Sequence, residues 1–417
     1  MKLLVITDSY PPHHSGGYEL RSKDILDCLG SRKHEILVLT TKCPTQRCDL
    51  HRGERNIFRE LHKDDPSKGL IERIYSEYQD IKLIHDAIRN FKPDLIYLFH
   101  VINLTRTIYP YLADRNIPIV FDEGGKGYLY SSLHRGPWYS FIDRKSNSRI
   151  KNGAKSLLIH GINILSKDLL KRQWKWPTDI RVYFNSHLNR RNARNTGIEV
   201  KEFPVIHSGI DERLFKYRSR EKMGTPIQIL VPGRIEPRKG QMDSVSLLAQ
   251  LLNAKIDASL IIIGTNNSTS YLEEIMNKIN SLSLERKVKL LPMVNHQTLV
   301  RFYQESDICF FTSHAQTGLS RVPLEAMACG SLLFAYGNEG SDEIVNDKET
   351  GFIVPQGNVA TIVEIIQELS RDHEKYQRMI RNARKCVEEN HTMDLYIDKI
   401  EGFLNQAVLE QHGTISS

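Results

Sequence analysis

The sequence lacks several features that define specialised classes of protein. No apolar run reaches the roughly 18 residues needed to span a bilayer, which argues against a transmembrane protein. Its six cysteines have no framework spacing, which argues against a disulfide-stapled secreted domain and suits a reducing compartment. The opening MKLLVITDSY predicts a strand rather than a signal peptide, because Asp8 and the Pro11–Pro12 turn follow at once. We therefore expect a cytoplasmic protein.

Metal and nucleic-acid sites also have little support in the sequence. Cys43, Cys48 and His51 lie close together, but their spacing is unlike that of zinc knuckles and no second pair follows. We therefore predict no metal site. The chain has a basic stretch, but this stretch does not lie on a recognisable nucleic-acid-binding module, so we predict no nucleic-acid partner.

The basic stretch runs from His134 to Lys201. Of the 57 Lys and Arg residues of the chain, 15 lie there, with only 4 of the 50 Asp and Glu residues, and Leu158, Ile162, Leu165 and Leu169 repeat at helical spacing. The three tryptophans of the chain lie there too: Trp138, Trp174 and Trp176. Basic residues with interfacial tryptophans suit peripheral contact with an anionic membrane at the inner face. A solvated helix whose tryptophans pack against their own domain fits equally well.

What is present predicts an α/β protein of two domains. A chain of 417 residues is too long for one ordinary core, and two domains of about 200 residues are the natural expectation. Short apolar strands alternate with amphipathic helices in both halves, which predicts two Rossmann-like, doubly wound parallel sheets. Lys216–Thr225 is charged and poor in apolar residues, as a linker would be. We predict domains at 1–215 and 216–393, and a final helix at 394–417 that can cross back to the first domain.

A glycine turn opens the first half. Gly16–Gly17 stand between a strand at Lys2–Thr7 and a helix that begins near Tyr18. The free N–H groups at a helix start stabilise negative charge, so this turn suits an anionic ligand. A glycine-rich turn that serves geometry alone fits equally well. Further along, the polar segment Lys42–Leu70 predicts an irregular insertion.

Polar side chains follow two later strands of the first half. His100 comes after a predicted strand that ends at Phe99, and Asp122 and Glu123 come after one that ends at Phe121. In an open α/β sheet, groups just past the strand ends face the ligand-binding crevice. Asp122 and Glu123, beside two glycines, therefore suit ligand contacts. His100 suits either a ligand contact or a structural histidine.

The second half carries the strongest pattern, between Ile227 and Gly330. Its first strand ends in a turn that holds Arg234 and Lys239, and its closing loop feeds a helix whose first turns hold Glu325. The strands between them predict a parallel sheet, whose carboxyl ends lie at one edge. Two cations and a carboxylate at that edge suit a ligand with a diphosphate and a ribose.

Five segments of the chain resemble family 4 retaining glycosyltransferases, whose GT-B fold has two Rossmann-like domains facing each other. They are YPPHHSGGYEL near the start, NS at Asn185–Ser186, VIHSGID at Val205–Asp211, GRIEPRKG at Gly233–Gly240 and GLSRVPLEAMACG at Gly318–Gly330. Each is weak alone. In the family's order and at the family's spacings, they extend the resemblance over nearly the whole chain.

The resemblance implies a nucleotide-sugar donor, a UDP-sugar or GDP-sugar, that acts as a co-substrate and is bound mostly by the second domain. Arg234 and Lys239 would neutralise the diphosphate as it leaves, and Glu325 would hold the ribose. Fixed cations stabilise charge where it develops in the transition state. The family's chemistry further implies a retained anomeric configuration, no need for a metal or other cofactor, and a glycan, lipid-linked or small-molecule acceptor.

The resemblance also implies a wider set of site residues. Asp122 and Glu123 join the two cations as catalytic candidates. Backbone N–H groups of the closing loop and of Gly17 would meet phosphate oxygens, and Val294 would lie near the base. The predicted substrate contacts are Gly16, Gly17, His100, Gly233, Val294, Thr317, Gly318, Leu319, Ser320, Arg321, Val322 and Glu325.

Two positions depart from the family's pattern. The family places a glutamate eight residues before Glu325, where this chain has Thr317. The family also has a histidine after the strand that ends at Phe121, where this chain has Asp122 and Glu123. The site is therefore either tuned to an unusual donor or substrate, or inactive. We expect a working hexosyltransferase of polysaccharide or glycolipid synthesis. The alternatives are a non-catalytic nucleotide-sugar-binding subunit that partners an active glycosyltransferase, and a GT-B phosphorylase or nucleotide-sugar epimerase.

Overall fold

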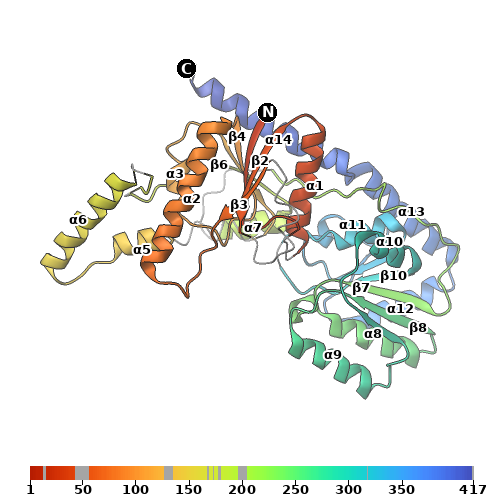
Figure 1. Cartoon of the computed structure of the whole chain (residues 1–417). Helices are drawn as coiled ribbons and strands as arrows, with labels where there is room; N and C mark the ends of the chain where they lie inside the picture. The colour runs from red at the N-terminus through yellow and green to blue at the C-terminus, as the bar shows by residue number, and fades with distance from the viewer. Residues whose placement is uncertain are drawn as a thin grey trace. The chain divides into compact units, whose positions relative to one another are not determined.

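The computed structural model describes residues 1–12, 16–42, 56–125, 135–166, 169–171, 173–176, 180–195, 204–316 and 318–415 (Figure 1). The chain forms two compact units, each built on one six-stranded sheet. The first unit takes residues 1–185, 189–206 and the chain from Lys399 onward, and the second takes 186–188 and 207–398. Helices connect the parallel strands in both units, so the predicted α/β class is confirmed.

The sheet of the first unit has the strand order β3-β2-β1-β4-β5-β6, and every neighbouring pair is parallel. Its central strands are apolar and buried, as strands covered by helices on both faces must be. Its strands are β1 (Lys2–Ile6), β2 (Glu35–Thr41), β3 (Ile57–Leu61), β4 (Leu95–Leu98), β5 (Ile119–Glu123) and β6 (Ile180–Phe184). Its helices are α1 (Gly17–Ser31), α2 (Leu70–Phe91), α3 (Ile108–Leu112), α5 (Pro137–Asp143), α6 (Arg149–Leu165) and most of α7 (His187–Asn195).

Two elements of the first unit differ from the prediction. The segment predicted as an irregular insertion contains β3, an edge strand that pairs with β2 and buries Leu61. Only alternate residues of β3 are covered, so its apolar pattern is too weak to stand out in the sequence. Strand β5 continues through Asp122 and Glu123, which pair with β6 and therefore do not lie past the strand's end.

The second unit repeats the architecture with the strand order β12-β11-β10-β7-β8-β9, again all parallel. Its strands are β7 (Ile227–Pro232), β8 (Ala258–Ile263), β9 (Val288–Leu291), β10 (Ile308–Phe311), β11 (Leu332–Ala335) and β12 (Phe352–Ile353). Its helices are η2 (Pro237–Lys239), α8 (Gln241–Asn253), α9 (Thr269–Ser281), α10 (His296–Glu305), α11 (Val322–Cys329), η3 (Ser341–Glu343), α12 (Val359–Leu369), α13 (His373–Asn390) and the start of α14 (Met393–Ile415). Apolar clusters fill both faces of the sheet.

Helix α14 is shared between the units, because its residues from Lys399 onward belong to the first. There Glu401 accepts hydrogen bonds from Arg32 Nη1 at 2.7 Å, and it lies 2.7 Å from His34 Nε2. These contacts, Arg32 foremost, lower the pKa of Glu401. The first long part of the first unit runs to residue 206, whereas the predicted boundary lies at 215, and Ile210 forms a bridge to Thr392 within the second unit.

The tryptophans of the basic stretch pack against their own unit. Trp138 is fully buried. Trp174 meets the ring of Tyr139 edge-on at 5.0 Å, and Trp176 lies 4.6 Å from the ring of Tyr109. All three rings therefore pack against residues of the first unit, Trp138 completely and the other two in part. Within the described ranges, no helix has both the length and the apolar composition needed to cross a membrane.

A buried carboxyl group joins three helical segments of the first unit. Glu77 of α2 accepts hydrogen bonds from the hydroxyls of Thr105 at 2.6 Å and Thr107 at 2.9 Å, and from the backbone N–H of Trp138 at 2.8 Å. Burial raises the pKa of Glu77 to about 7, although these hydrogen bonds oppose the shift.

This carboxyl group makes the stability of the first unit depend on pH. Because the pKa is higher in the folded state than the ordinary value of 4.5, its contribution to stability is complete below about pH 4.5 and is lost as pH rises through 7. Thermal unfolding followed from pH 4.5 to 8 should therefore show a decline in wild type that Glu77→Gln lacks. Glu72→Gln, an exposed control on the same helix, should keep the decline. Identical pH profiles for wild type and Glu77→Gln would contradict this account.

Candidate functional site

The loop that follows β7 is held at the edge of the sheet by close backbone contacts at two glycines. A Cβ at Gly264, after β8, would lie 1.8 Å from the carbonyl oxygen of Gly233, so no larger residue fits. Gly240 has φ 65°, where glycine is favoured, and a Cβ there would lie 2.3 Å from the carbonyl oxygen of Thr312. The segment between Gly233 and Gly240, which carries the predicted cations, is therefore fixed against the ends of β8 and β10.

Both predicted cations lie on this loop. Arg234 keeps a third of its side chain exposed, and its guanidinium lies 3.5 Å from Glu236. Lys239 is more buried, and its Nζ donates to the two carboxylate oxygens of Glu339 at 2.6 and 2.8 Å. The Lys239 ammonium also lies 5.9 Å from the centre of the Phe311 ring. Since β7 and β10 are parallel neighbours, these groups share one edge of the sheet.

Glu339 was not among the predicted site residues. It follows β11, in the glycine turn GNEGSDE. An acidic residue in a glycine turn just past a strand end is a sequence signal that could have indicated a site residue. The carboxylate could not be assigned to Lys239 from the sequence, because the two residues are 100 positions apart and meet only through strand order.

The predicted ribose carboxylate, Glu325, lies in the first turn of α11. Its Oε2 accepts a hydrogen bond from the Tyr303 hydroxyl at 2.9 Å, and its Oε1 lies 3.7 Å from Arg321 Nε. Burial, with the Glu325 charge beside it, raises the pKa of Tyr303 far above the usual value, so its hydroxyl stays a donor. Tyr303 was missed by the sequence analysis, because a tyrosine on an amphipathic helix is indistinguishable from a core residue.

The closing loop is partly engaged by the protein itself. Ser320 N donates to Glu339 O at 3.1 Å, and Val322 N donates to Ser320 Oγ at 3.4 Å, so both predicted phosphate donors have a partner within the unit. Gly318 adopts φ 78°, and Leu319 is buried. Thr317 lies outside the described residues.

Val294 lies in the loop after β9, as predicted, and packs against the apolar cluster of the second unit. The neighbouring Met293 is 63% exposed. Its Sδ accepts a hydrogen bond from Thr265 Oγ1 at 3.6 Å. An exposed thioether beside a half-buried valine offers an apolar surface for a flat ring.

In the first unit, Gly16 and Gly17 begin α1, as predicted. Gly16 caps the helix with extended backbone, and a Cβ at Gly17 would meet nothing within 4 Å. His100 follows β4, and its Nδ1 lies 3.0 Å from Asp8 Oδ1. Burial would lower the pKa of His100, but the Asp8 carboxylate outweighs this and raises it. His100 is thus held in place by a charged partner.

The structure places Asp122, predicted as a catalytic group, inside the first unit. Asp122 is fully buried in β5, where one carboxylate oxygen pairs with Arg21 and accepts from Tyr18, and the other accepts from Tyr183. Both oxygens are therefore used inside the unit. Glu123 is also buried, and its Oε1 accepts from Gly125 N at 2.8 Å. Their sequence position past an apolar run did not reveal that β5 extends through them.

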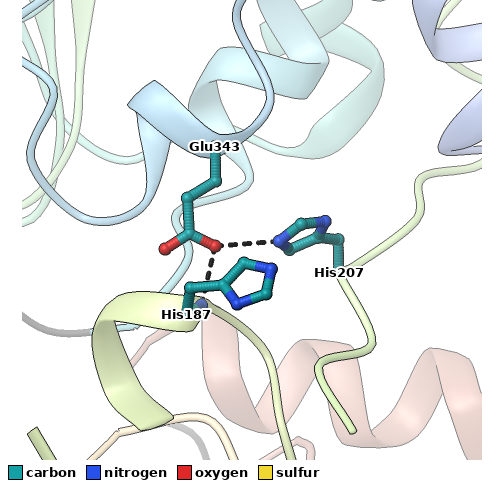
Figure 2. Close-up of side chains that lie close together, drawn as sticks. All are labelled: His187, His207 and Glu343. Atoms are coloured by element: carbon teal, nitrogen blue, oxygen red, sulfur yellow. Dashed lines mark hydrogen bonds and ion pairs between the residues drawn. The ribbon is translucent and has the colours of Figure 1, made fainter. Parts of the chain in front are cut away.

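One group of side chains among the described residues could hold a metal: His187, His207 and Glu343, whose ligand atoms lie within 4.8 Å of one another (Figure 2). The Glu343 carboxylate accepts from the backbone N–H of His187 at 2.7 Å and of Leu188 at 2.8 Å, and lies 2.9 Å from His207 Nε2. Burial alone would raise the pKa of Glu343, but these hydrogen bonds lower it. A carboxylate that caps the first N–H groups of α7 explains the group without an ion.

Comparison with known proteins finds a family for the part of the chain that carries Arg234, Lys239 and Glu325. Residues 213–386 match the family model described as glycosyl transferases group 1. This segment belongs to that family. It contains the loop after β7, the closing loop and Glu325, whereas the candidate residues of the first unit lie outside it.

The relatives extend the likeness beyond this domain. A GDP-mannose-dependent monoacylated alpha-(1-6)-phosphatidylinositol monomannoside mannosyltransferase from Corynebacterium glutamicum is 27% identical over 54% of this chain and 62% of that protein. A glycogen synthase from Mycobacterium tuberculosis is 21% identical over 92% of this chain and 90% of its own length. The crystal structure of Anabaena HepE with UDP and glucose superposes with a TM-score of 0.68 at 20% identity, covering 97% of this chain and 100% of that one. The fold is therefore GT-B, as predicted.

The position of Asp122 yields a test that separates a structural from a catalytic role. Asp122→Asn removes the carboxylate charge that pairs with the buried Arg21, which should destabilise the first unit by about 3–5 kcal/mol. Asp27→Asn, which removes the exposed partner of Lys23 on α1, should change the unfolding temperature little. Calorimetric unfolding of both variants measures the difference. Lost turnover of Asp122→Asn with an unchanged unfolding temperature would support the catalytic role instead.

Proposed function

We propose that this protein is a retaining glycosyltransferase that moves a hexose-type sugar from a nucleoside diphosphate to a hydroxyl of an acceptor, without a metal. The observation that supports this most is the set formed by Arg234, Lys239 and Glu325 at one edge of the second unit's sheet. It supplies two cations for a diphosphate and a held carboxylate for vicinal hydroxyls.

The chemistry proposed for this set follows from where charge develops. The bond between the anomeric carbon and the diphosphate oxygen breaks, and the bonding electrons leave with the diphosphate. Arg234 and Lys239 stabilise that charge in place of a metal ion. The acceptor hydroxyl attacks from the face of the leaving group and gives its proton to a phosphate oxygen, so the anomeric configuration is retained.

For the donor we propose a UDP- or GDP-sugar. HepE was solved with UDP and glucose, and the Corynebacterium relative is named as GDP-mannose-dependent, so both bases occur among similar proteins. The loop with Met293 and Val294 offers an apolar surface on which either base can lie. A thermal-shift and hydrolysis screen with UDP-glucose and GDP-mannose, with and without Mg²⁺, separates the two bases and tests the absence of a metal requirement.

Substitution of the cations tests the proposed reaction. Arg234→Ala and Lys239→Ala should each lower kcat/KM about a hundredfold or more, because each removes a partner of the leaving charge. The matched controls are Arg286→Ala and Lys289→Ala. They remove exposed basic side chains, one in the turn before β9 and one in β9 itself. Sugar transfer is measured with whichever donor the screen selects. Full activity of both Arg234→Ala and Lys239→Ala would rule out this mechanism.

We also propose that the first unit contacts an anionic membrane surface through helix α6. Figure 1 shows α6 on the outer side of that unit, away from the sheet. Ile150, Leu157 and Ile164, spaced seven residues apart on one face, are 86%, 74% and 64% exposed. The opposite face packs through Ile159 and Ile162 against the cluster around Trp138. Helix α6 is therefore apolar on its solvent side as well as on its packed side. An exposed apolar face of this kind is typical of an interaction surface.

The charges around α6 favour a lipid headgroup surface. Between Arg144 and Leu165 the sequence has no Asp or Glu, and its cations are Arg144, Lys145, Arg149, Lys151 and Lys155. Basic residues beside an exposed apolar stripe suit an anionic membrane. By contrast, Lys171 and Lys175, in the same basic stretch, form ion pairs with Asp114 at 2.9 and 3.5 Å, so they are less available.

Vesicle binding tests this surface. The protein should sediment with phosphatidylglycerol vesicles but not with phosphatidylcholine vesicles, and added salt should weaken binding. The triple substitution of Ile150, Leu157 and Ile164 by Ser should reduce binding at all salt concentrations. Leu409→Ser, an equally exposed leucine on α14, serves as the control. Equal binding by the triple variant and wild type would show that α6 is not the contact.

A further inference from the structure

Lys239, proposed to meet the leaving diphosphate, already has an anionic partner in the second unit. Its ammonium donates to both oxygens of the Glu339 carboxylate, and the two side chains are only 14% and 10% exposed. The backbone of Glu339 is tied on both sides to the closing loop, because its N–H donates to Ala315 O at 3.2 Å and its carbonyl accepts from Ser320 N at 3.1 Å. The pair is therefore built into the candidate site.

The backbone at Glu339 is strained. Its φ is 49°, between Gly337 at 73° and Gly340 at 68°, in a turn where glycine is the favoured residue. A side chain in this left-handed region costs free energy and persists where the surroundings over-determine it, commonly at functional sites. A glutamate at this position, rather than a third glycine, therefore needs a reason beyond the turn.

The chemistry of a carboxylate limits what that reason can be. A carboxylate accepts hydrogen bonds and repels phosphate oxygens, so among the groups of a nucleotide sugar it suits hydroxyls. The ribose hydroxyls are already assigned to Glu325, which lies on a different element. The hydroxyls that remain are those of the transferred sugar, which is bonded to the diphosphate that Lys239 would meet.

We propose that Glu339 binds hydroxyl groups of the transferred sugar, with Lys239 placed between this carboxylate and the diphosphate. In this arrangement Lys239 donates to both, so the position of the leaving group and that of the sugar are fixed by one ion pair. Glu339 is then a specificity-determining residue for the sugar. This inference rests on the proposed glycosyltransferase function and names the part of the donor that the turn after β11 recognises.

The test compares binding of a nucleotide with and without its sugar. Calorimetry of UDP against UDP-glucose, and of GDP against GDP-mannose, is carried out on wild type, Glu339→Gln and Glu339→Gly. Both variants should bind the nucleotide sugar roughly 10- to 100-fold more weakly, as expected for loss of a charged hydrogen-bond partner. Binding of the bare diphosphate should be unchanged or tighter, because Lys239 loses a competing anion.

The controls separate this inference from the function on which it rests. Glu349→Gln, an exposed carboxyl before β12, should change neither affinity, and Glu339→Gly should fold because glycine suits φ 49°. Equal weakening of diphosphate and nucleotide sugar would overturn the proposal, since Glu339 would then act only through Lys239. The proposal would also be overturned if the Glu339 variants bound the diphosphate and the nucleotide sugar as tightly as wild type does. In that case Arg234→Ala would still weaken the binding of UDP or GDP, so the proposed function would stand. If wild type bound none of the four probes, the glycosyltransferase proposal would fail together with it.

Discussion

The site of the second unit depends on one constraint: all six strands of its sheet are parallel, so their carboxyl ends lie at one edge. The loops after β7, β10 and β11 meet there although they are far apart in the chain. Close backbone contacts lock them together, at Gly240 against Thr312 and at Ser320 against Glu339. The cations and carboxylates at this edge are therefore positioned by main-chain geometry before any ligand binds, which is what electrostatic stabilisation of a leaving group requires.

Buried charges in both units are neutralised locally, since an unpaired charge away from water is costly. In the first unit, Arg21 and Asp122 form a buried pair, and the hydroxyls of Tyr18 and Tyr183 donate to the Asp122 carboxylate. In the second unit, the side chains of Lys239 and Glu339 remain partly exposed to solvent. The difference in exposure, rather than the type of residue, distinguishes a structural pair from one that can meet a ligand.

The two units differ in what they offer a substrate. The second carries two cations and two carboxylates, Arg234, Lys239, Glu325 and Glu339, at one edge of its sheet. The first carries an apolar, basic helix, α6, whose exposed face is not explained by its own core. The two features are independent in the fold, because one depends on the strand ends of a sheet and the other on the outer face of a single helix.

The sequence by itself determined the α/β class, most strands and helices, and the roles expected of Arg234, Lys239 and Glu325, because these depend on local periodicity and on motifs a few residues long. It did not determine that β5 runs through Asp122, that the tryptophans are packed, or that Tyr303 and Glu339 reach the site. Those facts depend on which strands are neighbours and on burial at positions far apart in the chain. Only the tertiary structure decides them, since a side chain's partner is set by the sheet order and not by its sequence neighbours.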